Sequence, residues 1–334
     1  MNERILLAHG SGGKLSHELV EKTFLQAFFN RYLAKLDDSA TFDLSGRLAF
    51  TTDSYVVEPI FFPGGDIGRL AVCGTVNDLS MVGAVPLYLS LSLIIEEGFP
   101  QEDLRRIVGS TKAAAEEAAV EIVAGDTKVV HRGKADGLFI NTAGIGSVPE
   151  GVNISGSNAK PGDKVILSGP IGDHGIAVLS QREGLSFSTQ LQSDVAPLNK
   201  LVAEILEVCP QIHCLRDPTR GGLATTLNEL AKQSQVSIRL DEKKIPIREE
   251  VMAACEMLGL DPLYVANEGK LVAMVPTEEA EGVLKVMKAN RYGREAAIIG
   301  EVSEGRPGRV TLKTGLGTSR VVDMLVGDLL PRIC

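Results

Sequence analysis

The chain has 334 residues, a formal net charge of −9, 44% hydrophobic residues and 23% charged residues. This composition is ordinary for a globular protein, and the length suits one large or two medium domains. The acidic balance argues against binding a nucleic-acid backbone, and 4% aromatic residues without Trp argue against base stacking. No apolar run reaches the 18 or more residues that a membrane span needs, so no membrane-spanning helix is expected.

The N-terminal residues and the cysteines indicate a compartment. The apolar run after Met1 is too short for a signal peptide. Five cysteines, an odd number, do not suggest a disulfide framework. We therefore expect a protein of the reducing cytoplasm.

Hydrophobic periodicity predicts alternating strands and helices in the first half of the chain. The predicted strands are residues 47–57, 87–93, 121–124 and 138–144, and the predicted helices are residues 70–82 and 101–119. A turn-rich stretch at residues 155–162 then interrupts the pattern.

The second half repeats the mixture of element types after that break. Strands are predicted at residues 164–167, 237–240, 270–275, 297–302 and 309–313, and helices near residues 196–208, 219–232, 248–258 and 278–289. The alternation is not a clean strand-helix-strand series, so α+β layers are as consistent with it as a parallel doubly wound sheet.

Two glycine-rich segments could contact phosphate. Gly10-Ser-Gly-Gly-Lys14 offers backbone N–H groups and an ammonium, but it lacks the glycine and hydroxyl positions of a P-loop. It reads equally well as an N-terminal arm. Gly169–Gly175 follows a predicted strand and precedes a helix, although its spacing is not that of a dinucleotide fingerprint, so a plain strand-to-helix turn is favoured.

Carboxylates recur where apolar strands end or in glycine-flanked turns. They are Asp53, Asp78, Asp126, Asp217 and Glu268. A single one would be read as a helix cap or turn residue, but five in this setting suggest hard oxygen ligands for Mg²⁺ that bridges phosphates. The five histidines form no H-x-H or H-E-x-x-H pair, so a zinc site is not expected.

The sequence ends in Pro331-Arg-Ile-Cys334. Proline disfavours a helix here, so the last residues suit an extended arm of about 30 Å that carries a thiol. Two interpretations follow: a covalent carrier that presents a group to an active site, or a frayed end whose last residue happens to be cysteine.

Taken together, these motifs resemble the HypE family of hydrogenase maturation factors, the carbamoyl dehydratases. The matching segments run along the chain: His9-Gly-Ser-Gly-Gly-Lys14, Thr51-Thr-Asp-Ser54, Phe61-Phe-Pro-Gly-Gly65, Gly125-Asp-Thr-Lys128, Phe139-Ile-Asn-Thr-Ala-Gly144, Gly172-Asp-His-Gly175, Ala266-Asn-Glu-Gly-Lys270 and Pro331-Arg-Ile-Cys334. The resemblance extends from residue 5 to residue 334 and implies the two-domain PurM-like fold of aminoimidazole ribonucleotide synthetase, an α+β fold whose N-terminal domains pair as a β-barrel in a homodimer.

The resemblance also implies a reaction and its partners. The carbamoyltransferase HypF delivers a carbamoyl group to Cys334, and ATP-dependent dehydration converts it to a thiocyanate. Cyanide then passes to iron on the HypC–HypD complex. We expect domains at residues 1–155 and 156–324, with a tail at residues 325–334.

The implied site uses ATP and Mg²⁺. Asp53, Asp78, Asp126 and Asp217 would hold the metal, while Lys14 and Asn77 would join them in binding the nucleotide. Cys334 would be the carrier, Glu268 the base and Lys128 the group that stabilises charge near the carbonyl oxygen.

Other readings remain open at the level of sequence. An aminoimidazole ribonucleotide synthetase, a selenophosphate synthetase or a thiamine phosphate kinase would show the same acidic residues, but none of them needs a terminal cysteine. A non-catalytic scaffold with a cysteine tail is also conceivable, although one thiol without neighbouring ligands makes a poor metal site.

Overall fold

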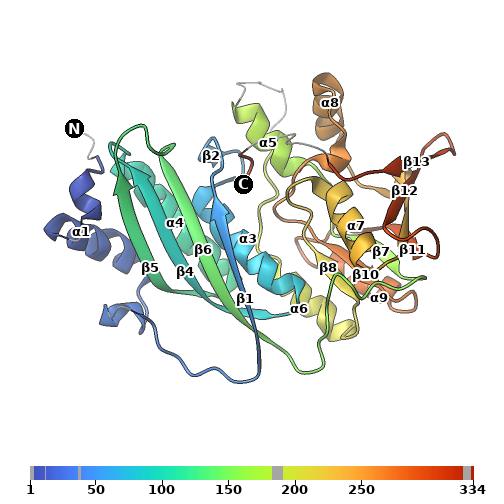
Figure 1. Ribbon diagram of the computed structural model, residues 1–334, viewed down its shortest axis with the longest axis horizontal. Coiled ribbons are helices and arrows are strands. Elements are labelled where there is room, and N and C mark those ends of the chain that lie inside the picture. The colour runs from blue at the N-terminus through green and yellow to red at the C-terminus, as the bar shows by residue number, and fades with distance from the viewer. Residues whose placement is uncertain (1–3, 12, 37–38, 183–190, 326–331) are drawn as a thin grey trace.

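The structure is a computed structural model that describes residues 4–11, 13–36, 39–182, 191–325 and 332–334. Each half of the chain builds one large mixed or antiparallel sheet with helices against it, and the C-terminus lies between the two halves (Figure 1). No helix in these residues is long and apolar enough to cross a membrane.

A four-stranded sheet, in the order β1-β6-β4-β5, forms the N-terminal half. The elements are η1 (Leu7–Gly10), α1 (Lys14–Leu19), the π-helical turn η2 (Val20–Leu25), α2 (Gln26–Phe28), η3 (Leu33–Lys35), β1 (Arg47–Tyr55), β2 (Phe61–Phe62), β3 (Gly65–Asp66), α3 (Ile67–Met81), β4 (Val85–Glu96), α4 (Gln101–Ala118), β5 (Glu121–Val130) and β6 (Leu138–Val148).

One face of this sheet is covered by α3, which packs against α4. Helix α3 is buried on nearly all sides, as expected of a helix enclosed by protein. Its first turn is capped by Asp66, whose carboxylate accepts hydrogen bonds from the N–H groups of Gly68 and Arg69.

No described element covers the opposite face of the sheet in this chain, and we call it the open face. Side chains alternate between the two faces with period two, so apolar residues of β1 and β4 project from the open face. Phe50 is 70% exposed, Leu48 46% and Ile94 44%. Exposed apolar side chains on a sheet face are typical of a surface that packs against protein.

A seven-stranded sheet, in the order β13-β12-β9-β11-β7-β10-β8, forms the C-terminal half. Its elements are β7 (Lys164–Leu167), α5 (Asp173–Arg182), α6 (Asn199–Val208), β8 (Cys214–Arg216), α7 (Gly222–Gln233), β9 (Ser237–Asp241), η4 (Glu242–Lys244), α8 (Glu249–Leu258), η5 (Pro262–Tyr264), β10 (Val272–Val275), α9 (Ala280–Ala289), β11 (Ala297–Ser303), β12 (Arg309–Lys313) and β13 (Ser319–Val322).

The central strands of the second sheet are buried on both faces. Val165 and Leu167 of β7 pack in the cluster that contains α7, whereas Ile166 packs on the other side with α6 and α9. This two-sided burial explains why β7 and β10 read as continuous apolar runs rather than alternating ones.

The two halves share hydrophobic packing. Leu79 and Met81 at the end of α3 lie in one cluster with Leu201 and Ile205 of α6. The tail residue Ile333, 3% exposed, joins the core of the N-terminal half. Because the contact is apolar, the cleft between the halves has a well-defined geometry.

The predicted elements are all present, with ends shifted by a few residues, and the α+β alternative is confirmed. Only the pairs β4–β5 and β9–β12 are parallel among the described ladders, and the other strand pairs are antiparallel. The prediction missed the helices of residues 14–28 and the short strands β8 and β13, which carry little periodicity.

Candidate active site

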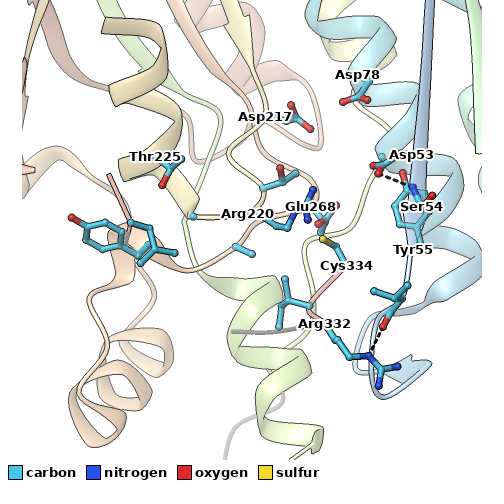
Figure 2. Close-up of a pocket in the computed structure, with 18 residues that line it drawn as sticks. Asp53, Ser54, Tyr55, Asp78, Asp217, Arg220, Thr225, Glu268, Arg332 and Cys334 are labelled. Carbon is cyan, nitrogen blue, oxygen red and sulfur yellow. Dashed lines mark hydrogen bonds between the residues drawn. The ribbon is translucent and has the colours of Figure 1, made fainter. Parts of the chain in front are cut away.

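A cavity of about 460 Å³ opens between the two halves (Figure 2). The N-terminal half contributes Asp53 from β1 and Asp78 from α3, while the C-terminal half contributes Asp217 and Glu268. Cys334 completes the lining. Sequence positions 53 to 334 therefore converge on one site, which brings together three of the four predicted aspartates and Glu268.

The last residues lie inside this cavity and pair with the segment that follows β1. The N–H of Val56 donates to the carbonyl oxygen of Cys334 at 3.2 Å, and the N–H of Glu58 donates to that of Arg332 at 3.1 Å. The sequence predicted an extended arm. Its described part, residues 332–334, is bound to the N-terminal half by these hydrogen bonds. Residues 326–331 lie outside the described part.

Arg332 fixes the tail to the rim of the N-terminal half. Its guanidinium donates to the carbonyl oxygen of Val56 at 3.1 Å and forms ion pairs with Glu58 at 2.8 Å and Asp136 at 2.7 Å. Arg182 adds a hydrogen bond to the carbonyl oxygen of Arg332 at 2.8 Å. The Cys334 thiol is thereby presented to the cavity on a short, bonded segment.

Burial, followed by the charge of neighbouring carboxylates, raises the pKa of three carboxyl groups of the cavity: Asp78, Asp217 and Glu268. Burial, followed by the charge of Asp78, raises the pKa of Asp217 to about 7. Burial also raises the pKa of Asp78, which accepts a hydrogen bond from the Thr51 hydroxyl at 2.8 Å. Burial and the charge of Asp217 raise the pKa of Glu268 well above its usual value, and its Oε1 has no hydrogen-bond partner among the described residues.

Such a site favours a bound cation. Acidic groups that lack cationic side-chain partners are costly when buried, and a divalent ion would relieve that cost. Among the described residues, no group of three or more His, Cys, Asp and Glu side chains is close enough to hold a metal by itself. Carboxylates are a ligand type that Mg²⁺ accepts, and proteins commonly bind this ion through one or two carboxylates together with substrate phosphates.

Glu268 is held in place by its main chain. Its N–H donates to the Asp194 carboxylate at 3.1 Å, and the same carboxylate pairs with Lys270 at 2.9 Å. Gly269 lies against this contact, since a Cβ there would come within 1.8 Å of the Asp194 carbonyl oxygen. The Ala-Asn-Glu-Gly-Lys motif thus needs glycine for close packing.

Asn77 is buried where the two halves of the chain meet. Its amide nitrogen donates to the carbonyl oxygens of Ala196 at 3.0 Å and Glu268 at 3.4 Å, and its amide oxygen accepts from the N–H of Leu198 at 2.8 Å. The side chain is 1% exposed, so its polar atoms face protein and not the cavity. Asn77 therefore bridges the two halves, and its contact with the nucleotide stays a prediction.

Asp126 and Lys128 do not line this cavity. The register pairs Asp53 with Thr142, Thr142 with Leu91, and Asp126 with Ser92, so Asp53 and Asp126 project from opposite faces of the sheet. Asp126 is exposed and pairs with Lys128 at 2.8 Å. The predicted four-aspartate metal site is therefore not assembled within a single chain.

Lys14 also lies away from the cavity. It stands at the first position of α1, its side chain is 89% exposed, and its ammonium is 3.8 Å from Glu18. Within one chain, the predicted contact of Lys14 with nucleotide at the Asp53 cavity is not formed. A second cavity, beside η1 and β5, lies between this N-terminal segment and the Asp126–Lys128 strand.

Several residues at the site were not predicted as functional. Asp194 positions Glu268, and Arg220 and Thr225 line the cavity. His174 accompanies the tail, because its ring contacts the carbonyl oxygen of Ile333 at 2.8 Å. His174 and Lys270 were already present in quoted motifs, whereas Asp194 follows an irregular stretch and gave no signal.

Comparisons with known proteins decide the family. Residues 36–148 match the N-terminal domain, and residues 160–313 the C-terminal domain, of AIR synthase related proteins. Carbamoyl dehydratase HypE of Azotobacter vinelandii is 56% identical over 334 residues, which cover 100% of this chain and 98% of that protein. The chain belongs to the HypE family.

Solved HypE structures agree with this assignment. A HypE crystal structure in complex with ATP is 52% identical with a TM-score of 0.96, covering 98% of this chain and 99% of the other. A HypE–HypF complex contains a chain that is 54% identical with a TM-score of 0.82, covering 92% of this chain and 99% of that one. The PurM-like two-part fold expected from the sequence is confirmed, while the paired barrel of a homodimer is a feature beyond a single chain.

Proposed function

We propose that this protein is an ATP-dependent carbamoyl dehydratase that converts a carbamoyl group on the Cys334 sulfur into a thiocyanate. The observation that carries the proposal is the placement of Cys334 in the same cavity as Glu268, with its sulfur directed toward that side chain (Figure 2). A frayed end would not be bonded to Val56 and Glu58 inside a cavity of carboxylates.

The chemistry requires a better leaving group than hydroxide. Transfer of the γ-phosphoryl group of ATP to the carbamoyl oxygen supplies one, since phosphate then departs with that oxygen. Loss of the two N–H protons completes the carbon–nitrogen triple bond. The tail brings the carbonyl carbon and the base together, so the elimination takes place within one bound assembly.

Glu268 suits the role of base. Burial beside other carboxylates raises its pKa, so its ionised form binds a proton more strongly than an ordinary glutamate does. Its main chain is fixed by Asp194, and its Oε1 has no partner that would compete for the proton. We keep Lys128 as the group that stabilises charge near the carbonyl oxygen, from the second cavity or from a paired copy.

Mg²⁺ fits the acidic wall formed by Asp53, Asp78 and Asp217. Bound there with phosphate oxygens, it would neutralise the charge of the transferred group. Without a bound cation, these carboxylates would repel a triphosphate, because among the described residues that line the cavity only Arg220 and Arg332 carry cationic side chains.

We infer a homodimer from the open face of the N-terminal sheet. Phe50, Leu48 and Ile94 would be buried by a second copy, and Asp126, Lys128 and Lys14 would then lie near the junction of the two chains. In such a dimer, Asp126, Lys128 and Lys14 of one chain could contribute to a nucleotide site together with residues of the second chain.

The proposed partners follow from the family. HypF would carbamoylate Cys334, in keeping with the HypE–HypF complex of a relative, and HypC–HypD would receive cyanide. The reducing cytoplasm would preserve the thiol, and none of the described cysteines forms a disulfide. We place the domain boundaries at residues 1–155 and 156–324, with the tail at residues 325–334.

The test is the mass of the C-terminal peptide. After incubation with HypF, carbamoyl phosphate and ATP, the Cys334 peptide should carry a cyano group, which is one water lighter than the carbamoyl group. Omitting ATP should leave the heavier form. A synthetase or kinase of the same fold would leave this peptide unmodified, and that result would reject the proposal.

A further inference from the structure

The tail is held from two sides of the cleft. Main-chain groups of Val56 and Glu58 bind it from the N-terminal half. From the C-terminal half, the Nε2 atom of His174 lies 2.8 Å from the carbonyl oxygen of Ile333, the residue before the thiol. His174 is the second residue of α5 and is completely buried.

The hydrogen bonds of His174 define its tautomer. A carbonyl oxygen can only accept, so Nε2 must carry the proton that is donated to Ile333. Nδ1 then accepts from the Ser193 hydroxyl at 2.8 Å, and the oxygen of that hydroxyl accepts from the N–H of Val195 at 3.1 Å. Phe62 packs edge-on against the ring, with 5.4 Å between ring centroids. The imidazole is therefore oriented toward the tail by partners on both sides.

The segment that orients His174 also positions Glu268. Ser193 contacts the imidazole, and the next residue, Asp194, accepts the N–H of Glu268 and pairs with Lys270. The same segment is bonded to the N-terminal half, because the N–H of Ser193 donates to the carbonyl oxygen of Pro63 at 2.8 Å. Two consecutive residues thus connect the tail, the candidate base and the opposite wall of the cleft.

We propose that His174 is a positioning residue that holds the docked tail by its Ile333 carbonyl, in register with Glu268 through Ser193 and Asp194. The inference rests on the proposed function, because register with the base matters only if Cys334 carries the reacting group. His174 does not contact the reacting atoms. Its loss should weaken tail docking and dehydration while leaving the thiol able to accept a carbamoyl group.

Two measurements distinguish an effect on tail docking from an effect on dehydration. The first is the rate of Cys334 alkylation by iodoacetamide in the full protein without substrates, read from the mass of the C-terminal peptide. The other four cysteines are buried, so alkylation should report on the tail. The second is the single-turnover rate of dehydration of carbamoylated protein after ATP is added.

The variants are His174→Leu, His174→Gln and Ser193→Ala, with His131→Leu in an exposed loop as the matched control. Loss of one hydrogen bond should make His174→Leu alkylate about threefold to tenfold faster and dehydrate more slowly by a similar factor or more. The glutamine amide can still donate to Ile333, so His174→Gln should recover most of both rates. Ser193→Ala should lie between, and the control should match wild type.

Equal alkylation rates in wild type and His174→Leu would overturn the proposal, as would a glutamine variant no better than leucine. If His174→Leu does not fold, the alkylation and dehydration rates of the other proteins decide in its place. His174→Gln should then lie closer to wild type than Ser193→Ala does. Because alkylation needs no turnover, a wild-type protein that fails to dehydrate rejects the proposed function and still leaves the docking result to be read.

Discussion

Asp78 and Asp126 lie on opposite sides of the N-terminal sheet and differ in their electrostatic state. Asp78, on the helix that covers one face, has its pKa raised by burial and by the charge of Asp53. Asp126, on the open face, has its pKa lowered by the hydrogen bond from Lys128. The same residue type is a candidate cation ligand in one place and a surface ion-pair member in the other.

The side of the sheet on which a carboxylate lies therefore determines whether it can share a ligand with the other carboxylates. The covered face and the C-terminal half enclose acidic groups that form no ion pair with a cationic side chain of the described residues, a setting that suits a bound cation and phosphates. The open face carries apolar side chains and an internally neutralised pair, which is the condition for packing against another surface. The predictions below test this division.

The largest effect is expected in the cavity, from Glu268→Gln. The amide keeps the size of the side chain and loses the proton acceptor, so dehydration should slow by about 10²–10⁴-fold. Carbamoylation of Cys334 by HypF should continue. Both steps are read from peptide mass over time, with the exposed Glu304→Gln as control, and an unchanged dehydration rate would remove Glu268 from the mechanism.

A substitution on the open face should change the oligomeric state of the protein. Phe50→Asp places a charge at the centre of the proposed interface, and truncating an aromatic anchor of this kind costs about 2–4 kcal/mol of binding. Analytical ultracentrifugation should show dissociation to monomer at micromolar concentration. Leu316→Asp, at a residue that is 95% exposed in a turn, should leave the assembly unchanged. A wild-type protein that is already monomeric would contradict the interface.

A smaller effect is expected where the two halves are joined. Asn77→Ala leaves the carbonyl oxygens of Ala196 and Glu268 and the N–H of Leu198 without a buried partner. The free energy of unfolding should fall by about 1–3 kcal/mol. Chemical denaturation measures this, and a loss below about 0.5 kcal/mol would show that Asn77 does not hold the halves together.

The smallest effect concerns the pH dependence of stability. The pKa of Asp217 is about 7 in the folded protein and ordinary when unfolded, so the folded state holds the proton more strongly. Stability should therefore fall as pH rises from about 4 to about 7. Asp217→Asn should be more stable than wild type at pH 8, by on the order of 1 kcal/mol, and equal to it at pH 4.

The same variant should show less thermal stabilisation by Mg²⁺ and ATP than wild type. Melting temperatures at pH 4, 6 and 8, with and without the ligands, provide the comparison. A pH profile of Asp217→Asn identical to that of wild type would mean that the carboxylate is not held in a proton-binding environment.

The sequence predicted much of the fold because its elements are strongly periodic. The runs at β7 and β10 and the amphipathic α4 were recognisable without tertiary information, and Asp53, Asp217 and Glu268 were identified by their places beside strands and glycines. The period-two pattern of each strand was also present, but which face it presents depends on register.

What could not be predicted depends on contacts between distant residues. The separation of Asp126 from Asp53 follows from ladder pairing across three strands. The pair Asp194–Lys270 joins residues 76 positions apart, and the His174–Ile333 contact spans 159. The bonds of Asn77 to Ala196 and Leu198 join residues about 120 positions apart in the sequence.

The fate of the carbamoyl oxygen gives the most direct test of the account. Protein carbamoylated on Cys334 with an ¹⁸O-labelled carbamoyl group is given unlabelled ATP in a single turnover, and the released phosphate is analysed by mass. Phosphoryl transfer to that oxygen predicts one ¹⁸O atom in each phosphate that is released with a thiocyanate. Unlabelled phosphate with the label in water would contradict the account, because ATP would then be cleaved without activating the group on the tail.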